Sequence, residues 1–161
     1  MLGGTQNMRV NCYLTEMNND KIPTLVKEKG FIYRTEALKH PDEIAAFMND
    51  VFHLDKRTEE FIYMISFDVK MKINGVFEIS HGVVNASLCS PREVYIRALL
   101  TGAASVILVH NHPSGEPTPS KDDLYLCERM KKAGEIIGVS LCDFIIIGDG
   151  NFVSFLEKGL L

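Results

Sequence analysis

The sequence lacks a long apolar run, an excess of positive charge and a framework of paired cysteines. No run approaches the roughly 18 apolar residues of a transmembrane helix, and the start is not a basic segment followed by an apolar one. Lysine and arginine number 17 against 21 aspartates and glutamates, a net charge of −4. This charge balance argues against binding to nucleic acid or anionic lipid that is dominated by electrostatic attraction. We therefore expect no membrane partner, and the charge disfavours nucleic acid.

The cysteines are few and widely separated. They stand at positions Cys12, Cys89, Cys127 and Cys142, without a Cys-x-x-Cys pair. Such spacing is typical of separate thiols in a reducing compartment, each used as a small apolar side chain. The sequence therefore predicts a cytoplasmic protein.

The chain is of ordinary size for one domain, with 161 residues of which 46% are hydrophobic. It has no internal repeat, low-complexity tract or Pro/Ser-rich linker. We predict a short N-terminal extension over residues 1–40, leading into one compact domain over residues 41–161. Within the extension, residues 9–14 and 31–35 are predicted to form short strands.

The predicted elements of the domain alternate between strands and helices. Apolar residues at three- and four-residue intervals predict a helix over 41–52. A capping box of Ser90 and Glu93, with Pro91 at the first position, predicts another over 91–101. A third helix begins after Ser120 and ends near Gly138, with Leu124, Cys127, Met130 and Ile137 toward the core. Strands rich in aromatic and β-branched residues are predicted over 61–67, 73–79, 83–88, 105–109, 141–147 and 152–156. This order predicts an α/β or α+β fold with a mixed sheet.

The segment from residue 110 to residue 123 carries the most chemistry, and it reads His-Asn-His-Pro-Ser-Gly-Glu-Pro-Thr-Pro-Ser-Lys-Asp-Asp. His110 and His112 follow the apolar strand 105–109. Side chains two residues apart in an extended chain point to the same face, so both imidazoles can bind one ion. The prolines and the glycine of the following loop stiffen and turn the chain. They can return Asp123, in the first turn of the next helix, to the same place.

Two imidazoles and one carboxylate are the ligand set of a catalytic zinc site. Water takes the fourth tetrahedral position in such a site, whereas a closed structural site takes four protein ligands. Zinc makes that water a hydroxide source near neutral pH. We predict Zn²⁺ held by His110, His112 and Asp123, with Asp122 as the competing carboxylate. The signatures His-Glu-x-x-His and Pro-Cys-x-x-Cys do not occur.

Hydrolysis also needs a group that moves the proton and a donor for the developing oxyanion. Glu60, at the start of the strand 61–67, is the candidate general base, and its neighbour Glu59 is the competing residue. Ser120 is the candidate oxyanion donor. The same serine also suits the N-cap of the following helix, a role without catalysis.

These residues resemble the JAMM (MPN) metalloproteases and, within them, the RadC-like bacterial proteins. The JAMM pattern is an upstream Glu, then His-x-His, seven residues that here begin with Pro113, Ser, two residues and Asp. It fits without a gap from His110 to Asp123. The similarity to the RadC branch covers roughly residues 41–161, through the segments 60–61, 80–82, 90–93, 110–115 and 145–150.

The resemblance implies a JAB/MPN fold of the cytidine-deaminase-like kind, with a mixed central sheet flanked by helices, and hydrolysis of peptide or isopeptide bonds. Carried over by position, the implied zinc ligands are His110, His112 and Asp123. Glu60 is then the general base and Ser120 the oxyanion partner.

Two features of the RadC branch are absent here. RadC-like proteins often have a histidine where this chain has Phe144, so any accessory role of that histidine is missing. Longer RadC proteins also carry a helix-hairpin-helix module that suggests DNA, and we expect none in this chain. The other histidines, His40, His53 and His81, are predicted to lie at the surface or in turns.

Three functions compete at this point. The first is a JAMM-type zinc hydrolase that acts on a peptide or isopeptide, including a ubiquitin-like conjugate. The alternative is a non-catalytic, zinc-binding interaction module associated with DNA repair or mobile-element processing. The third is a metal-dependent nuclease, because activated water also attacks phosphorus. The acidic net charge counts against the nuclease.

Overall fold

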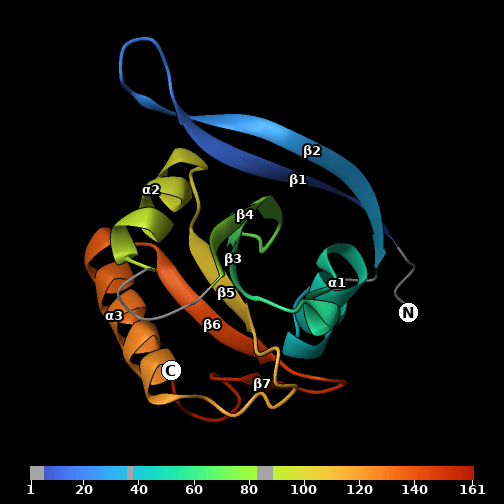
Figure 1. Cartoon of the computed structure of the whole chain (residues 1–161). Helices are drawn as coiled ribbons and strands as arrows, with labels where there is room; N and C mark the ends of the chain where they lie inside the picture. The colour runs from blue at the N-terminus through green and yellow to red at the C-terminus, as the bar shows by residue number, and fades with distance from the viewer. Residues whose placement is uncertain (1–5, 36–37, 83–88) are drawn as a thin grey trace.

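A mixed sheet between two layers of helices forms the centre of the molecule (Figure 1). The computed structural model describes residues 6–35, 38–82 and 89–161. In this part of the chain the sheet has seven strands in the order β2-β1-β4-β3-β5-β6-β7. Helix α1 covers one face, and α2 and α3 cover the other. The α/β prediction with a mixed, helix-flanked sheet is confirmed.

The elements follow the predicted order. In sequence they are β1 (Gln6–Met17), β2 (Pro23–Thr35), α1 (Pro41–Phe52), the short 3-10 helix η1 (Leu54–Lys56), β3 (Glu60–Phe67), β4 (Ile73–Gly82), α2 (Pro91–Leu100), β5 (Ser105–Asn111), α3 (Lys121–Ile137), β6 (Ser140–Ile147) and β7 (Phe152–Ser154). Strands β1 and β4 are parallel, as are β5 and β6, and the other neighbouring pairs are antiparallel. The strand predicted over 83–88 lies outside the described residues.

The two central strands, β3 and β5, divide the apolar core into two clusters. Phe61, Tyr63 and Ile65 of β3 pack in the cluster under α1, whereas Ile62 and Met64 pack in the cluster under α2 and α3. This alternation is the period of an extended chain buried on both faces. Strand β5 is also buried along its whole length, which explains its continuous apolar sequence.

Helix α1 is amphipathic and matches its predicted bounds. Pro41 stands at its first position, where a missing N–H costs no hydrogen bond. The helix buries Ile44, Phe47 and Met48 against the sheet. Each fully buried side chain of this size stabilises the fold by roughly 1.5–3 kcal/mol. The helix ends at His53, which is exposed and adopts a left-handed backbone conformation.

Helix α3 has the predicted bounds, but its predicted core face is partly wrong. Leu124 and Ile137 are 42% and 40% exposed. Cys127 and Met130 are buried as predicted, and the other buried positions are Asp123, Leu126 and Gly134. These five positions follow three- and four-residue spacing, counted from Asp123. The helix therefore turns the Asp123 carboxylate inward on the same face as its apolar residues.

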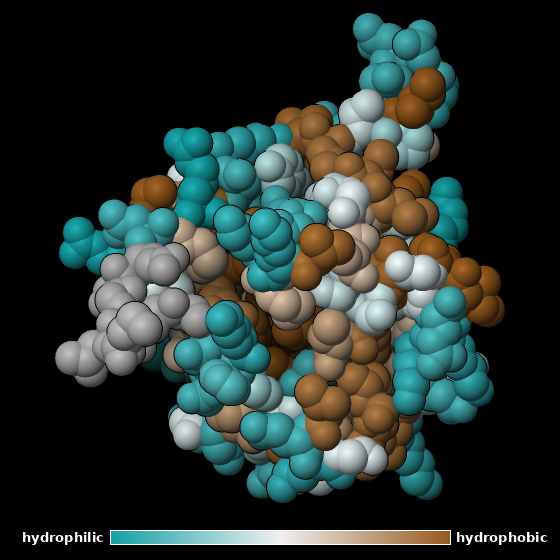
Figure 2. All heavy atoms as spheres, turned by 180° about the vertical axis from the view of Figure 1, so that it is seen from behind, coloured by the Kyte–Doolittle hydropathy of each residue, from teal (hydrophilic) through white to brown (hydrophobic). Residues whose placement is uncertain are grey.

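The hairpin of β1 and β2 is longer than the strands predicted over 9–14 and 31–35. Most of β2 is exposed or half-buried, so it lacks the clean alternation that sequence patterns detect. Among the described residues, β1 pairs with β4 at one position, Cys12 with Val76. The far end of the hairpin stands clear of the body with mainly hydrophilic side chains (Figure 2).

The length of the described helices and the state of the cysteines can be read from the structure. None of the described helices has the length and apolar character needed to cross a bilayer. All four cysteines are free thiols, and three of them are buried. Burial raises the pKa of Cys89 and of Cys127 to about 12. These thiols therefore serve as apolar packing groups and are unreactive near neutral pH.

Candidate metal centre

Three side chains meet at one end of the sheet. His110 lies near the end of β5, His112 follows it directly, and Asp123 lies in the first turn of α3. Their ligand atoms all lie within 4.8 Å of one another. His110 Nε2 is 3.7 Å from Asp123 Oδ1, and His112 Nε2 is 3.4 Å from Asp123 Oδ2. Bonds of about 2.0–2.2 Å to a tetrahedral zinc separate its ligand atoms by roughly 3.3–3.6 Å. The two nitrogen–oxygen distances are close to this separation, and the wider 4.8 Å span of the group would have to contract for all three atoms to bind one ion.

The hydrogen bonds of the two imidazoles fix which nitrogen faces the carboxylate. His110 Nδ1 lies 2.8 Å from the Phe61 carbonyl oxygen, and His112 Nδ1 lies 2.8 Å from the Glu116 carbonyl oxygen. A carbonyl oxygen only accepts, so each Nδ1 carries the hydrogen. In a neutral ring, Nε2 then offers a lone pair toward Asp123. Electron-pair donors that face one another in this way are the arrangement of a cation site, with the second nitrogen oriented by a carbonyl.

Asp123 is held by the residue that begins its own helix. Its Oδ2 accepts hydrogen bonds from Ser120 N at 2.8 Å and from Ser120 Oγ at 2.6 Å. Ser120 Oγ in turn accepts from Asp123 N at 3.1 Å, which completes a capping box. Burial alone would raise the pKa of Asp123, but the hydrogen bonds with His112 and Ser120 outweigh it and lower the pKa to about 2. The carboxylate is therefore ionised and fixed in direction.

The two imidazoles experience opposite influences. Burial lowers the pKa of His110. The pKa of His112 is raised, because its ring, when protonated, can donate a hydrogen bond from Nε2 to Asp123. His110 and Asp123 are almost fully buried, and the His112 side chain is 13% exposed. The site is thus closed on the side of the sheet and opens at His112.

The loop between β5 and α3 is anchored on the turn between β6 and β7. His112 N donates to Ile147 O, and Asp149 N donates to Gly115 O, each at 2.9 Å. Gly148 is required there, because a Cβ on it would lie 2.3 Å from Gly115 O. The segment 145–150 therefore supports the loop that returns the chain to Asp123.

Glu60 begins β3 at the same end of the sheet as His110. It is half-buried and stands opposite Gly82 of β4. The negative charge of Glu60 raises the pKa of both His110 and His112. This effect is smaller than those of burial and of Asp123. This carboxylate therefore lies in the neighbourhood of the two rings without belonging to the donor group. Its neighbour Glu59 is exposed and contacts His81.

The remaining predicted positions have clear places. The Ser120 hydroxyl donates to Asp123, so in this structure it positions a carboxylate and caps a helix. Its oxyanion role stays a prediction. Phe144 is fully buried and stacks on His110 with ring centroids 6.4 Å apart. The site therefore has an apolar wall at this position. His81 is exposed, as predicted.

Sequence reasoning missed the groups that orient the ligands. Two are backbone carbonyls, of Phe61 and Glu116, which no side-chain pattern reveals. Sequence reasoning also missed Asn111, which stands between the two histidines in the sequence, is buried, and binds the backbone of Glu59 and Phe61. Its place inside the His-x-His motif was a signal, because a buried amide needs partners for both its donor and its acceptor.

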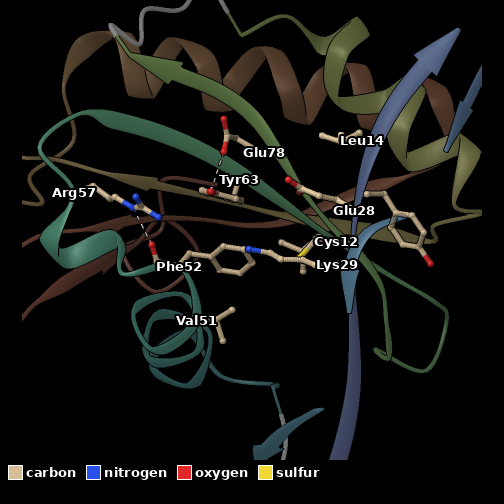
Figure 3. Close-up of a pocket in the computed structure, with 11 residues that line it drawn as sticks. Cys12, Leu14, Glu28, Lys29, Val51, Phe52, Arg57, Tyr63 and Glu78 are labelled. Carbon is tan, nitrogen blue, oxygen red and sulfur yellow. Dashed lines mark hydrogen bonds between the residues drawn. The ribbon is translucent and has the colours of Figure 1, made fainter. Parts of the chain in front are cut away.

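A separate hollow of about 340 Å³ lies on the α1 side of the sheet, between the hairpin and the end of α1 (Figure 3). Lys29 reaches over the ring of Phe52, 5.0 Å from its centroid, and Arg57 Nε donates to Phe52 O. Tyr63 OH donates to Glu78. The core residues that line this hollow belong to the cluster under α1, so the sheet separates it from the metal centre.

Comparisons with known proteins agree with this architecture. The family model described as "RadC-like JAB domain" matches residues 38–160. A UPF0758 protein of Pelobacter propionicus is 46% identical over 114 residues, which cover 70% of this chain and 50% of that protein. The UPF0758 protein of Geobacter sulfurreducens is 42% identical over 127 residues, covering 79% and 55%.

A third relative, the UPF0758 protein of Clostridium perfringens, is 40% identical over 124 residues, covering 77% of this chain and 54% of that protein. The chain thus spans about half the length of the curated relatives it matches, and their names state no activity. The matched range contains β3 to β7, all three helices and every residue of the candidate metal centre. The chain belongs to the RadC-like JAB domain family.

Proposed function

We propose that this protein is a zinc-dependent hydrolase of the JAMM type that cleaves peptide or isopeptide bonds. The convergence of two imidazole nitrogens and one carboxylate, each oriented by a second hydrogen bond, is the observation that carries the proposal. His110, His112 and Asp123 would hold the ion. A zinc ion held by three protein ligands supplies Lewis-acid activation of water and of a carbonyl group.

The protein's own residues supply the proton transfers. In the proposed reaction Glu60 accepts a proton from the attacking water as the water oxygen bonds to the carbonyl carbon. Glu60 then gives that proton to the nitrogen as the carbon–nitrogen bond breaks, so one carboxylate serves as base and acid. The support is its place at the start of β3, close enough for its charge to act on both imidazoles.

The substrate class and the location belong to the same proposal. The open side of the site at His112 would admit an extended chain, such as a peptide tail or a ubiquitin-like conjugate. The four free cysteines support a cytoplasmic location.

Zinc content and turnover test the proposal together. Protein purified without chelator should contain about one zinc per chain by elemental analysis. It should also cleave at least one member of a library of peptides and isopeptide-linked conjugates. Zinc without turnover on that library, together with a stable protein complex, would instead support the non-catalytic interaction module.

Glu60→Gln should lower kcat by about 10²- to 10⁴-fold, the usual contribution of general acid–base catalysis, and leave the zinc content unchanged. Glu59→Gln is the matched control, because Glu59 is the adjacent, exposed carboxylate. It should retain full kcat. A zinc-loaded Glu60→Gln protein with wild-type kcat would show that another group moves the proton.

A further inference from the structure

We infer that Asn111 is a positioning residue for the Glu60 carboxylate. Its side-chain amide binds the backbone on both sides of Glu60 and ties it to the strand that carries His110. The inference rests on the proposed function, in which Glu60 moves the proton. It adds a role for the middle residue of the His-x-His motif.

The backbone pairing of β3 with β5 does not reach Glu60, the first residue of β3. Its last pair joins Ile62 to His110. From there, side chains of β5 continue the connection. His110 Nδ1–H donates to Phe61 O at 2.8 Å, as described above. Without further contacts, this bond and the backbone pairs of residues 62–67 would be all that joins the start of β3 to β5.

Asn111 supplies those contacts with both ends of its amide. Its Oδ1 accepts from Phe61 N at 2.7 Å, and its Nδ2 donates to Glu59 O at 3.0 Å. The two backbone groups belong to the residues immediately after and before Glu60. Strand β4 pairs with Glu60 and Phe61 on one side, and the Asn111 side chain takes the place of a neighbouring strand on the other. Together they fix the direction from which the Glu60 side chain leaves the backbone.

Burial makes this arrangement specific to asparagine. Asn111 is 1% exposed, so a side chain lacking a donor or an acceptor leaves a buried backbone group without its partner. Aspartate is almost the same size, but it can only accept when ionised. It would keep the bond from Phe61 N and place an oxygen against Glu59 O.

Catalysis is sensitive to such changes, because a displacement of about 1 Å can cost about 10²-fold in rate. Asn111 itself does not touch the donor atoms of the metal centre. Its loss should therefore move Glu60 relative to the imidazoles and leave the three donors in place. This separates it from His110, whose loss removes a ligand.

The test compares Asn111→Asp and Asn111→Ala in the zinc-loaded full chain. In both variants kcat should fall by about 10²-fold, with KM changed by less than about threefold and zinc still near one per chain. In a Glu60→Gln background, Asn111→Asp should cause no further loss, because the group it positions is gone. Asn74→Ala is the matched control: Asn74 Nδ2 donates to Thr101 O at 3.2 Å, and its loss should leave kcat unchanged.

Two results would overturn the inference. One is an equal fractional loss of kcat from Asn111→Asp in both backgrounds, and the other is loss of zinc from that variant. If the wild-type chain cleaves no substrate, the proposed function fails and crystal structures of the zinc-loaded proteins decide the positioning separately. A Glu60 carboxylate displaced by about 1 Å or more in Asn111→Asp supports it, and superimposable carboxylates refute it.

Discussion

Asp123 combines two roles in a single carboxylate. One oxygen, Oδ2, receives both the backbone N–H and the hydroxyl of Ser120, and both oxygens face an imidazole Nε2. The start of α3 and the metal centre are therefore built from the same contacts. A carboxylate at a helix N-terminus is also favoured by the helix dipole. Folding of the helix thus orients the Asp123 carboxylate within the candidate metal centre.

Replacing this carboxylate should separate the two roles. In Asp123→Asn the amide oxygen still accepts from Ser120 N, so α3 should keep its helical content by circular dichroism. The zinc affinity should fall by more than the 10- to 100-fold typical of losing an outer-shell partner, because a ligand itself is lost. Competition with a chromophoric chelator measures this affinity.

Asp122→Asn is the control for that experiment. Asp122 is the adjacent, exposed carboxylate in the same turn, and its replacement should leave zinc affinity unchanged. Retention of wild-type affinity by Asp123→Asn, or an equal loss in Asp122→Asn, would remove Asp123 from the ligand set.

Among the elements, the turn between β6 and β7 shapes the metal centre without contributing a ligand. Gly148→Ala should push Gly115 O away, since the new Cβ would lie 2.3 Å from it. We expect zinc affinity to fall by about 10- to 100-fold, as when a supporting contact of a ligand is lost. Isothermal titration with zinc would measure it.

The control for this prediction lies in the same turn. Gly150 has a φ of 69° and open space around its Cβ position. Asparagine tolerates this left-handed conformation better than most residues, so Gly150→Asn should keep wild-type zinc affinity. Equal affinities in both variants and the wild type would show that the turn does not support the loop.

The elements also show which parts of the fold could be predicted from the sequence. Helix α1 and strands β3 and β5 were predictable because each buries a face, or both faces, and so carries a regular apolar pattern. The hairpin was underestimated because much of β2 faces solvent. The predicted core face of α3 was partly wrong. Asp123, a charged residue, occupies a buried position that hydrophobic periodicity does not count.

The same limit applies within the metal centre. The residues at motif positions could be named in advance, because His110, His112 and Asp123 carry their chemistry in their side chains. Their orientation depends on the carbonyls of Phe61 and Glu116. Every residue has a carbonyl, so only the folded chain shows which ones take part.

At the scale of the whole molecule, the attachment of the hairpin differs from the packing of the central strands. Strands β3 and β5 are covered on both faces by the two apolar clusters. The hairpin buries Val10 and Cys12 in the cluster under α1, and in the described part of the chain its pairing with β4 is that of Cys12 with Val76. A segment with fewer buried contacts opens at a lower free energy than the core.

Native-state hydrogen exchange should therefore divide the sheet into two units. Amides of β3 and β5 should exchange only on global unfolding, and those of β1 and β2 should exchange through a smaller opening that leaves β5 intact. Two matched substitutions sharpen the test, because Val10 in β1 and Val109 in β5 are both fully buried. Each valine-to-alanine change should cost about 1–3 kcal/mol in the unit to which the residue belongs.

Val10→Ala should speed exchange in the hairpin and leave the slowest amides of β5 almost unchanged. Val109→Ala should speed exchange of the slowest amides throughout β3 and β5, because it lowers the free energy of global unfolding. Measurement by mass spectrometry or NMR at increasing denaturant distinguishes the two classes of opening. If Val10→Ala instead accelerated the amides of β5 as strongly as those of β1, the hairpin and the central strands would form one cooperative unit. The contacts of the hairpin with the body, which include the pair of Cys12 with Val76 and the packing of Tyr13 on Phe77 and of Tyr33 on Phe47, would then be enough to couple them.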